Sequence, residues 1–500
     1  MRPLLQASLP PLAQPVIVAV ALVYLVVVAA IATWAASRTR TVRDFFVAGS
    51  GIGLWTLAIA KMAATLSGFS FVGGPGLVYA IGLAGVFIIL PGALTNALGA
   101  WVLAKKLRLL GEVRGLLTIP GAIGARYRSP AAHGLSAAAI LVAVVGYVAT
   151  NLLALGIVID AIFGTGLTTG IWIGMAIILT YTAAGGILAG IYTDVFHGAV
   201  MAVASLAVFV FALRSGGGMD HISRTIMGAD PAFLAPWGAA GPMTALSFFF
   251  VFSLGSLGQP HVISKFYMLR DPRQFKWYLL LMSLALLVTQ LLYFSIPLAT
   301  KALVTTGAMP PLATPDQATP MFLLRFTPVF VAGLVFSGVA AAIMATVNSF
   351  MNVGAAALTH DIPVAMGRRL RHELQWGRLS TVLIAVVAAA VAQLSGTLVA
   401  FLGIFGWGLF ASTIAPALAI GLHWTGATRA GAIASIATGL GVTLVGESLG
   451  YFRVYTLPTG ISVSGLSLVT SFLVFFGVSW LTRARAAAEI DADIRLVMDL

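Results

Sequence analysis

The chain has 500 residues, of which 60% are hydrophobic and only 9% are charged, and its formal net charge is +13. A soluble domain carries about 25% charged residues, so the composition excludes a water-soluble protein of this length. The basic residues lie in short loops between apolar stretches, where they orient a membrane protein, and this distribution argues against a nucleic-acid partner. The sequence has no cysteine, which excludes disulfides and thiolate metal sites.

Hydrophobic stretches of about 20 residues recur along the whole chain, and this is the length that crosses ~30 Å of hydrocarbon. They predict an all-α polytopic membrane protein with about 13 transmembrane helices. The tail that follows the last span predicts either a short amphipathic helix at the cytoplasmic surface or a disordered segment. The expected spans are 15–37, 53–78, 80–104, 133–161, 166–189, 193–214, 243–262, 277–301, 322–355, 377–397, 399–423, 429–449 and 462–482.

The distribution of lysine and arginine predicts the orientation of these spans. The first span has one arginine before it and three in the seven residues that follow. A secretory signal peptide has the opposite asymmetry and a shorter apolar core, so we expect a retained span with the N-terminus outside. Alternating the spans from there places 21 of the 28 basic residues inside or at inner span ends and 6 outside or at outer span ends, with Lys61 alone deep within a span. This bias predicts a protein of the bacterial cytoplasmic membrane with a cytoplasmic C-terminus.

Two of the expected spans contain residues that interrupt helices. Span 53–78 has Gly68 in its middle, and span 243–262 has Gly255, Gly258 and Pro260. Irregular backbone survives in lipid only where it lines a cavity, and two interrupted spans of opposite direction indicate a midplane binding site in an inverted-repeat transporter. The alternative is that these glycines serve only close helix packing.

Four stretches carry a family likeness: DFFVAGSGIGLWTLAIAKMAATLSGFSFVGGPG from Asp44, YTAAGGILAGIYTDVFHG from Tyr181, LGSLGQPHVISKFYMLRD from Leu254 and GVAAAIMATVNSFMNVGAAALTHDI from Gly338. Together they resemble the sodium:solute symporter family, although His197 stands where that family usually has glutamine. The resemblance implies a single transporter domain with a five-plus-five inverted-repeat core and discontinuous helices. Its expected parts are the repeats 52–214 and 243–423, the peripheral helices 15–37 and 429–482, and the cytoplasmic tail 483–500.

The resemblance also implies a sodium site between the broken second span and the ninth span. Sodium is a hard cation, and carbonyls that are freed where a helix unwinds supply the oxygens it prefers. Ala345 stands where the family has a serine, so one ligand oxygen is missing. The corresponding positions are Ala63, Leu66 and Ala342, which supply carbonyls, and Ala345 and Thr346 at the hydroxyl positions.

Lys61 and Asp194 are the expected coupling residues. A membrane-embedded lysine costs about 2.5–3.5 kcal/mol on insertion scales, which favours a function for Lys61 as a tethered cation at the ion site or as a proton carrier. The alternative is that its side chain snorkels to the interface. Asp194 belongs to a Thr-Asp pair that the family places near the ion exit path, and its alternative role is a helix N-cap. We also expect that Lys61 and Asp194 can form a buried pair.

By resemblance, the substrate contacts come from the two broken spans, and a half-helix N-terminus at a break favours a carboxylate on the solute. The span-eleven aromatics Phe401, Phe405, Trp407 and Phe410 are interpreted as lipid-facing or packed residues, with the lining of a gate as the alternative. His261 is interpreted as a structural residue at the cytoplasmic end, with a proton relay as the alternative. Ser256 stands where proline transporters have an aromatic residue, which disfavours proline. The expected contacts are Thr65, Ser67, Gly68, Ser70, Phe252, Ser253, Ser256 and Gln259.

The resulting prediction is a secondary transporter that couples sodium to uptake of a small organic solute such as an amino acid, a monocarboxylate or a pantothenate-like compound. Sodium is its coupling ion, membrane lipid surrounds it, and no obligate protein partner is expected. The 15 acidic residues and 7 histidines are scattered, so an enzyme is not expected. The alternatives are a proton-coupled or ion-independent transporter of the same fold, and a membrane solute sensor that does not transport.

Overall fold

The computed structural model describes residues 13–36, 51–89, 91–92, 99–396, 398–455, 457–458, 460–484, 486 and 490–499. Within these residues every regular element is helical, and one isolated backbone pairing joins Ile52 to Leu269. Eleven helices of the described part are long and apolar enough to cross a membrane. The structure therefore agrees with an all-α membrane protein.

The first half of the chain comprises the elements that precede the second interrupted span. Its elements are α1 (Ala13–Ala36), α3 (Leu54–Thr65), η2 (Phe69–Gly73), α4 (Gly74–Ile81), η3 (Gly82–Ile88), η4 (Ala100–Ala104), α6 (Lys105–Arg114), α7 (Ile119–Tyr127), α8 (Pro130–Phe163), α9 (Leu167–Ser215), α10 (Met219–Ala229) and η5 (Pro231–Leu234).

The second half begins with that span. Its elements are α11 (Gly241–Gly255), α12 (Pro260–Ile263), η6 (Ser264–Met268), η7 (Pro272–Gln274), α13 (Phe275–Thr305), η8 (Pro315–Gln317), α14 (Ala318–Phe326), α15 (Val329–Ala356), η9 (Ala357–Asp361), α16 (Ile362–Ala365), α17 (Glu373–Leu394), α18 (Val399–Thr413), η10 (Pro416–Ile420), α19 (Arg429–Tyr451), α20 (Val463–Leu481) and α21 (Ala492–Met498).

The number of 13 spans stays a prediction. The expected span 80–104 contains residue 90 and residues 93–98, which lie outside the described residues. The expected connection at 190–192 is not a loop, because the spans 166–189 and 193–214 join in the single 49-residue helix α9. That connection contains no proline, the residue that most strongly ends a helix.

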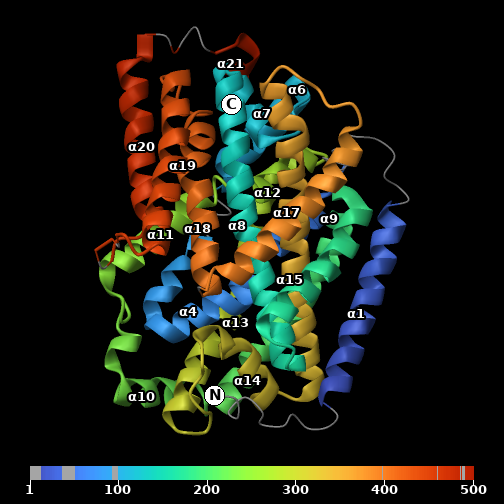
Figure 1. The fold of residues 1–500 in the computed structure, drawn as a ribbon, viewed down its shortest axis with the longest axis vertical. Helices are drawn as coiled ribbons and strands as arrows, with labels where there is room; N and C mark the ends of the chain where they lie inside the picture. The colour runs from blue at the N-terminus through green and yellow to red at the C-terminus, as the bar shows by residue number, and fades with distance from the viewer. Residues whose placement is uncertain are drawn as a thin grey trace.

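The centre of the molecule is formed by α8, α15 and α18, whose side chains are mostly buried. In contrast, α1 flanks one side and α19 and α20 flank the other, and most of their side chains are not buried (Figure 1). The helices that carry both interruptions, α3 and α11, pack onto this central group.

The C-terminal segment contains the helix α21, which docks on α6 at the end of the molecule opposite α10 and α14 (Figure 1). Arg114 pairs with Asp491 at 2.7 Å and also with Asp493. The hydrogen bond from Arg114 lowers the pKa of Asp493 to about 2. Lys106 donates to the carbonyl of Met498 at 2.6 Å. Of the two expectations for the tail, the structure has the helix.

The second interruption depends on close contact between two backbones, and this gives a stability prediction. A Cβ at Gly258 would lie 2.4 Å from the Phe410 carbonyl oxygen and 3.2 Å from the Ala415 nitrogen. Backbone atoms cannot move aside as a flexible side chain does, so we expect Gly258→Ala to destabilise the protein by roughly 1–3 kcal/mol. Thermal unfolding in detergent measures this.

Gly477 on α20 is the matched control, because a Cβ there meets no atom within 4 Å. Gly477→Ala should leave the melting temperature unchanged or raise it slightly, since alanine is the better helix former. Equal melting temperatures for wild type and Gly258→Ala would contradict the close approach.

Candidate functional site

The second predicted span is broken between Leu66 and Gly68. The helix α3 ends at Thr65, and Leu66 has extended backbone (φ −84°, ψ 135°) before η2 begins at Phe69. The central helix α8 holds the break: Asn151 Oδ1 accepts the Gly68 N–H at 2.9 Å. A Cβ at Gly68 would lie 2.7 Å from the Ala154 Cβ, so the break lies directly against α8. The interruption expected at Gly68 is therefore present.

The seventh predicted span is broken between Gly255 and Pro260. The helix α11 ends at Gly255, Gln259 has φ −75° and ψ 97°, and helical structure resumes at Pro260. Proline suits this place because it lacks the backbone donor that the first helical turn leaves unpaired. Both breaks lie against the interior helices, with α18 packed on the second one.

The predicted ion ligands meet where the first break contacts α15. Thr346 Oγ1 donates to the carbonyl of Leu66 at 2.5 Å and lies 3.2 Å from that of Ala64. The five predicted residues are all buried: Ala63, Leu66, Ala342, Ala345 and Thr346. Carbonyl and hydroxyl oxygens with no carboxylate form a donor set that fits a hard monovalent cation. Ala345 supplies no side-chain oxygen, so the set has one hydroxyl.

Asp194 forms a buried ion pair with Lys265. Asp194 Oδ2 and Lys265 Nζ are 2.7 Å apart, each side chain is 1% exposed, and Lys265 Nζ also donates to the Ala60 carbonyl at 3.0 Å. The expected pair between Lys61 and Asp194 was therefore wrong. So was the N-cap alternative, since Asp194 lies inside α9. Lys265 follows the second break by five residues, and the sequence alone indicated only a basic residue near a membrane boundary.

Lys61 is buried and forms no ion pair with a carboxylate that the structure describes. Its side chain is 1% exposed, which excludes snorkelling to the interface in this conformation. The ammonium lies 3.9 Å from the ring centroid of Phe266 and 5.0 Å from that of Tyr278. Among the residues the structure describes, it has no carboxylate within 4.0 Å and no hydrogen-bond acceptor. It contacts η6 and α13, whereas the predicted ion ligands lie between α3 and α15.

Aromatic rings from several helices surround the two breaks. Phe252 stacks on Phe69 with centroids 5.6 Å apart and on Trp407 with centroids 5.0 Å apart. Tyr147 hydrogen-bonds Ser67 at 3.3 Å, and its ring lies 6.2 Å from that of Trp407. Sequence reasoning did not select Tyr147, Asn151 or Trp407 as site residues, because no local motif shows which residues of an interior helix face a break.

Several buried polar atoms at the second break have no hydrogen-bond partner among the described residues. They belong to Ser253, Gln259 and Trp407: the hydroxyl, both amide atoms and the indole nitrogen. Such orphaned groups are costly to bury, and a polar ligand would satisfy them. In contrast, Thr65 donates back to the Lys61 carbonyl at 2.8 Å and Ser256 to that of Ser253 at 2.8 Å. Ser70 is half-buried on η2.

The other aromatic residues of span eleven differ in their surroundings. Phe401 is 51% exposed, and Phe410 is buried and stacks on Phe350 at 5.8 Å. His261 also lies against Phe350, with centroids 3.8 Å apart. Phe410 and His261 are thus packed against Phe350, whereas Phe401 is exposed on the surface of the molecule. Within the described residues, the Trp407 indole nitrogen and the His261 Nδ1 atom both lack a hydrogen-bond partner near the second break.

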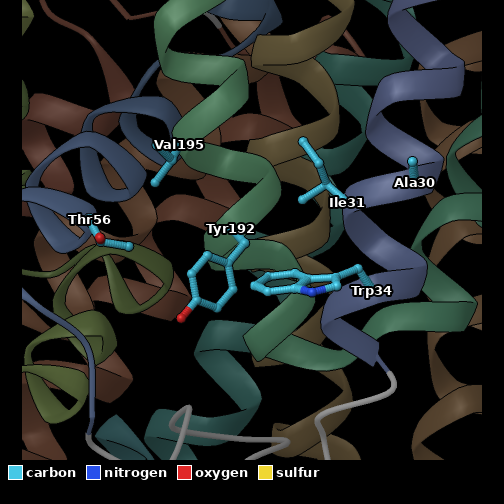
Figure 2. A pocket seen from close by; sticks show the side chains of 6 residues that line it. All are labelled: Ala30, Ile31, Trp34, Thr56, Tyr192 and Val195. Atoms are coloured by element: carbon cyan, nitrogen blue, oxygen red, sulfur yellow. The ribbon is translucent and has the colours of Figure 1, made fainter.

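A groove of about 480 Å³ lies elsewhere, between α1, α3 and α9 (Figure 2). In Figure 2, Trp34 of α1 and Tyr192 of α9 lie next to each other, and their ring centroids are 5.3 Å apart. The lining is almost wholly apolar: Ala30, Ile31, Trp34, Thr56, Tyr192 and Val195. It lacks the polar groups that would orient a charged solute, so the breaks are the better candidate site.

Comparison with known proteins agrees with this geometry. The model of the sodium:solute symporter family matches residues 45–439. The high-affinity proline transporter PutP of Bacillus subtilis (strain 168) is 27% identical, with 92% of this chain and 96% of the relative covered. The sodium/pantothenate symporter of Escherichia coli (strain K12) is 25% identical, with 83% and 87% covered.

Two solved structures share the fold. A substrate-bound, outward-open Na⁺-coupled sialic acid symporter has a TM-score of 0.74 at 16% identity, with 93% of this chain and 98% of the other covered. The nucleobase-cation-symport-1 family transporter Mhp1 has a TM-score of 0.56 at 14% identity, with 91% and 98% covered. The chain thus belongs to the sodium:solute symporter family, as an integral inner-membrane transporter that couples sodium to the movement of a small solute.

Proposed function

We propose that the protein takes up a small carboxylate-bearing solute together with sodium, through a site formed by the two helix breaks. The observation that carries the proposal is the contact of the Thr346 hydroxyl with the Leu66 carbonyl at the first break. It joins α3 and α15 through oxygens that a sodium ion can take in place of the hydrogen bond. Ala63 and Ala342 supply further carbonyls in the proposed site.

The solute would bind between the breaks, where Phe252 and Trp407 offer flat apolar surfaces. The unpaired atoms of Ser253, Gln259 and Trp407 would hydrogen-bond it, with Ser67, Gly68 and Ser70 on the opposite break. Thr65 and Ser256 use their hydroxyls within the chain and would contribute only after reorienting. The positive end of the helix that starts at Phe69 favours a carboxylate on the solute. Proline and pantothenate, which the two relatives are named for, both carry one.

The orientation and the inverted-repeat layout belong to the same proposal. The end of the molecule with α6, α7 and α21 is rich in basic residues, which supports a cytoplasmic location under the positive-inside rule. The N-terminus would then lie outside. Residues 52–214 and 243–423 would form the two repeats, and each repeat begins with an interrupted helix.

Proton coupling is a second candidate, and one observation favours it. The Lys61 ammonium is buried over Phe266, and no carboxylate of the described residues pairs with it, so its charged form is poorly compensated within this part of the chain. A lysine in such a place can gain and lose a proton as the surrounding helices move. Asp194 would hold Lys265 and the adjoining part of α3 in place near the ion path.

Sodium-specific stabilisation tests the coupling ion without knowledge of the solute. We expect a higher melting temperature in sodium chloride than in potassium or choline chloride at equal ionic strength. At tenfold over Kd the stabilisation is roughly 1.4 kcal/mol. Uptake of labelled proline, pantothenate and a monocarboxylate into proteoliposomes, with an imposed sodium or proton gradient, then identifies the solute and the driving ion.

Uptake driven by a proton gradient, with no sodium-specific stabilisation, would replace sodium coupling with the proton-coupled alternative. Solute binding without accumulation in vesicles would instead indicate a sensor. Lys61→Met separates the two coupling schemes, because it should abolish proton-driven uptake and leave sodium-driven uptake intact.

A further inference from the structure

A short segment at the end opposite α21 wedges between the first broken helix and α18. Thr319 Oγ1 donates to the carbonyl of Phe71 on η2 at 2.7 Å. Three residues earlier, Asp316 Oδ2 accepts the backbone N–H of Val399, the first residue of α18, at 2.9 Å. Residues 316–319 therefore bind both η2 and the start of α18.

Asp316 packs closely against α4, and η2 packs directly against the start of α18. A Cβ at Gly76 of α4 would lie 2.6 Å from Asp316 Oδ1, and a Cβ at Gly73 would lie 2.8 Å from the Val399 Cγ1. Asp316 itself is 2% exposed. Neither α4 nor α18 can move away from the other without exposing Asp316 to water.

Only one of the two carboxyl oxygens is satisfied. Asp316 Oδ1 has no hydrogen-bond partner among the described residues, although it is buried. Burial raises the pKa of Asp316 to about 7, and the Val399 N–H opposes this. Within the described ranges, no ion pair or hydrogen bond links Asp316 to a charged group. The titratable residues on the elements packed against it are Tyr79 on α4, His133, Tyr147 and Asp160 on α8, and Arg325 on α14, whereas η2 and α18 have none.

We propose that Asp316 is a proton-operated latch, whose protonation stabilises the closed arrangement of the wedge, α4 and α18 and whose ionisation favours opening. The inference rests on the proposed uptake and orientation, in which this end faces the outside and would open and close as the solute is carried across. In the closed state the carboxyl is in a dry site that disfavours its charge. In the open state it is hydrated and behaves as an ordinary aspartate.

The sign of the pH effect follows from this difference. The pKa of Asp316 is about 7 in the closed state, and an aspartate in water titrates near 3.9. Protonation therefore stabilises the closed state fully at low pH, and this stabilisation is lost as the pH rises through 7. Linkage predicts that the open-to-closed ratio falls about tenfold between pH 8 and pH 6.

The absence of native cysteine makes the test direct. Val72, fully buried on η2, would be replaced by cysteine, which is smaller, and alkylated from outside in proteoliposomes. Exposed Met227→Cys on α10 corrects for the intrinsic pH dependence of thiol reactivity. We expect the corrected labelling rate of Val72→Cys to fall about tenfold from pH 8 to pH 6.

Asp316→Asn mimics the protonated carboxyl, so labelling in this background should be slow and independent of pH. Asp160→Asn is the matched control, since Asp160 caps Gly166 at 2.7 Å and should leave the pH dependence unchanged. A tenfold pH effect that persists in Asp316→Asn, or no effect in the parent, would overturn the latch. Labelling needs neither solute nor sodium, so its result stands apart from the uptake assay that tests the proposed function.

Discussion

Thr346→Ala is expected to abolish the sodium-specific rise in melting temperature. The substitution removes the single side-chain hydroxyl of the proposed ion site, which contacts the carbonyl of Leu66 at 2.5 Å. We expect the Kd for sodium to rise at least tenfold, which corresponds to about 1.4 kcal/mol of binding free energy. Melting curves over a sodium titration, with potassium keeping the ionic strength constant, measure this change.

Two further variants control for a simple packing effect. Thr346→Ser keeps the hydroxyl while it loses a methyl group, so its sodium response should stay close to wild type. Ala345→Ser adds an oxygen at the predicted ligand position that lacks one, so it should raise the affinity for sodium. If Thr346→Ala responds to sodium as the wild type does, the ion does not bind at this break.

Asp194→Asn should destabilise the protein by roughly 3–5 kcal/mol, because it leaves a buried ammonium without its carboxylate. The affected ammonium is that of Lys265, which lies 2.7 Å from Asp194 and shares its burial. Thermal unfolding in detergent measures the loss. Adding Lys265→Met to Asp194→Asn should restore much of the stability, since the charge and its partner are then both absent.

Lys61→Met provides the discriminating comparison. Alone it should be neutral or stabilising, because it removes a buried ammonium that has no carboxylate among the described residues. Combined with Asp194→Asn it should not rescue stability. Rescue by Lys61→Met, with none by Lys265→Met, would show that Asp194 pairs with Lys61 in the membrane.

The interruptions in the helices could be predicted from the sequence because their causes are local. Glycine and proline weaken or end a helix wherever they occur, and both span interruptions contain them. The helix α3 ends just before Gly68, and α11 ends at Gly255. The resemblance to the family also pointed to the region around Leu66 and Thr346. Their contact agrees with that expectation, although they are separated by 280 residues in the chain.

The ion pair of Asp194 could not be predicted in this way. Lys61 was the only lysine considered as its partner, and the contact with Lys265 depends on how α3, α9 and η6 cross, which no local pattern encodes. The continuity of α9 through residues 190–192 could not be predicted either. Glycine-rich stretches can either end a helix or continue it, and the surrounding helices decide which.

The sequence by itself determined that this protein lies in the membrane and where its helices are interrupted, because hydrophobicity, glycine and proline act over short stretches of chain. Four local motifs also indicated its family. Only the tertiary structure decided which side chains meet. Lys265 rather than Lys61 pairs with Asp194, Trp407 stacks on Phe252 beside the breaks, and Asp316 accepts the N–H of Val399 at the start of α18. These contacts join residues far apart in the chain, and packing of the helices sets their geometry.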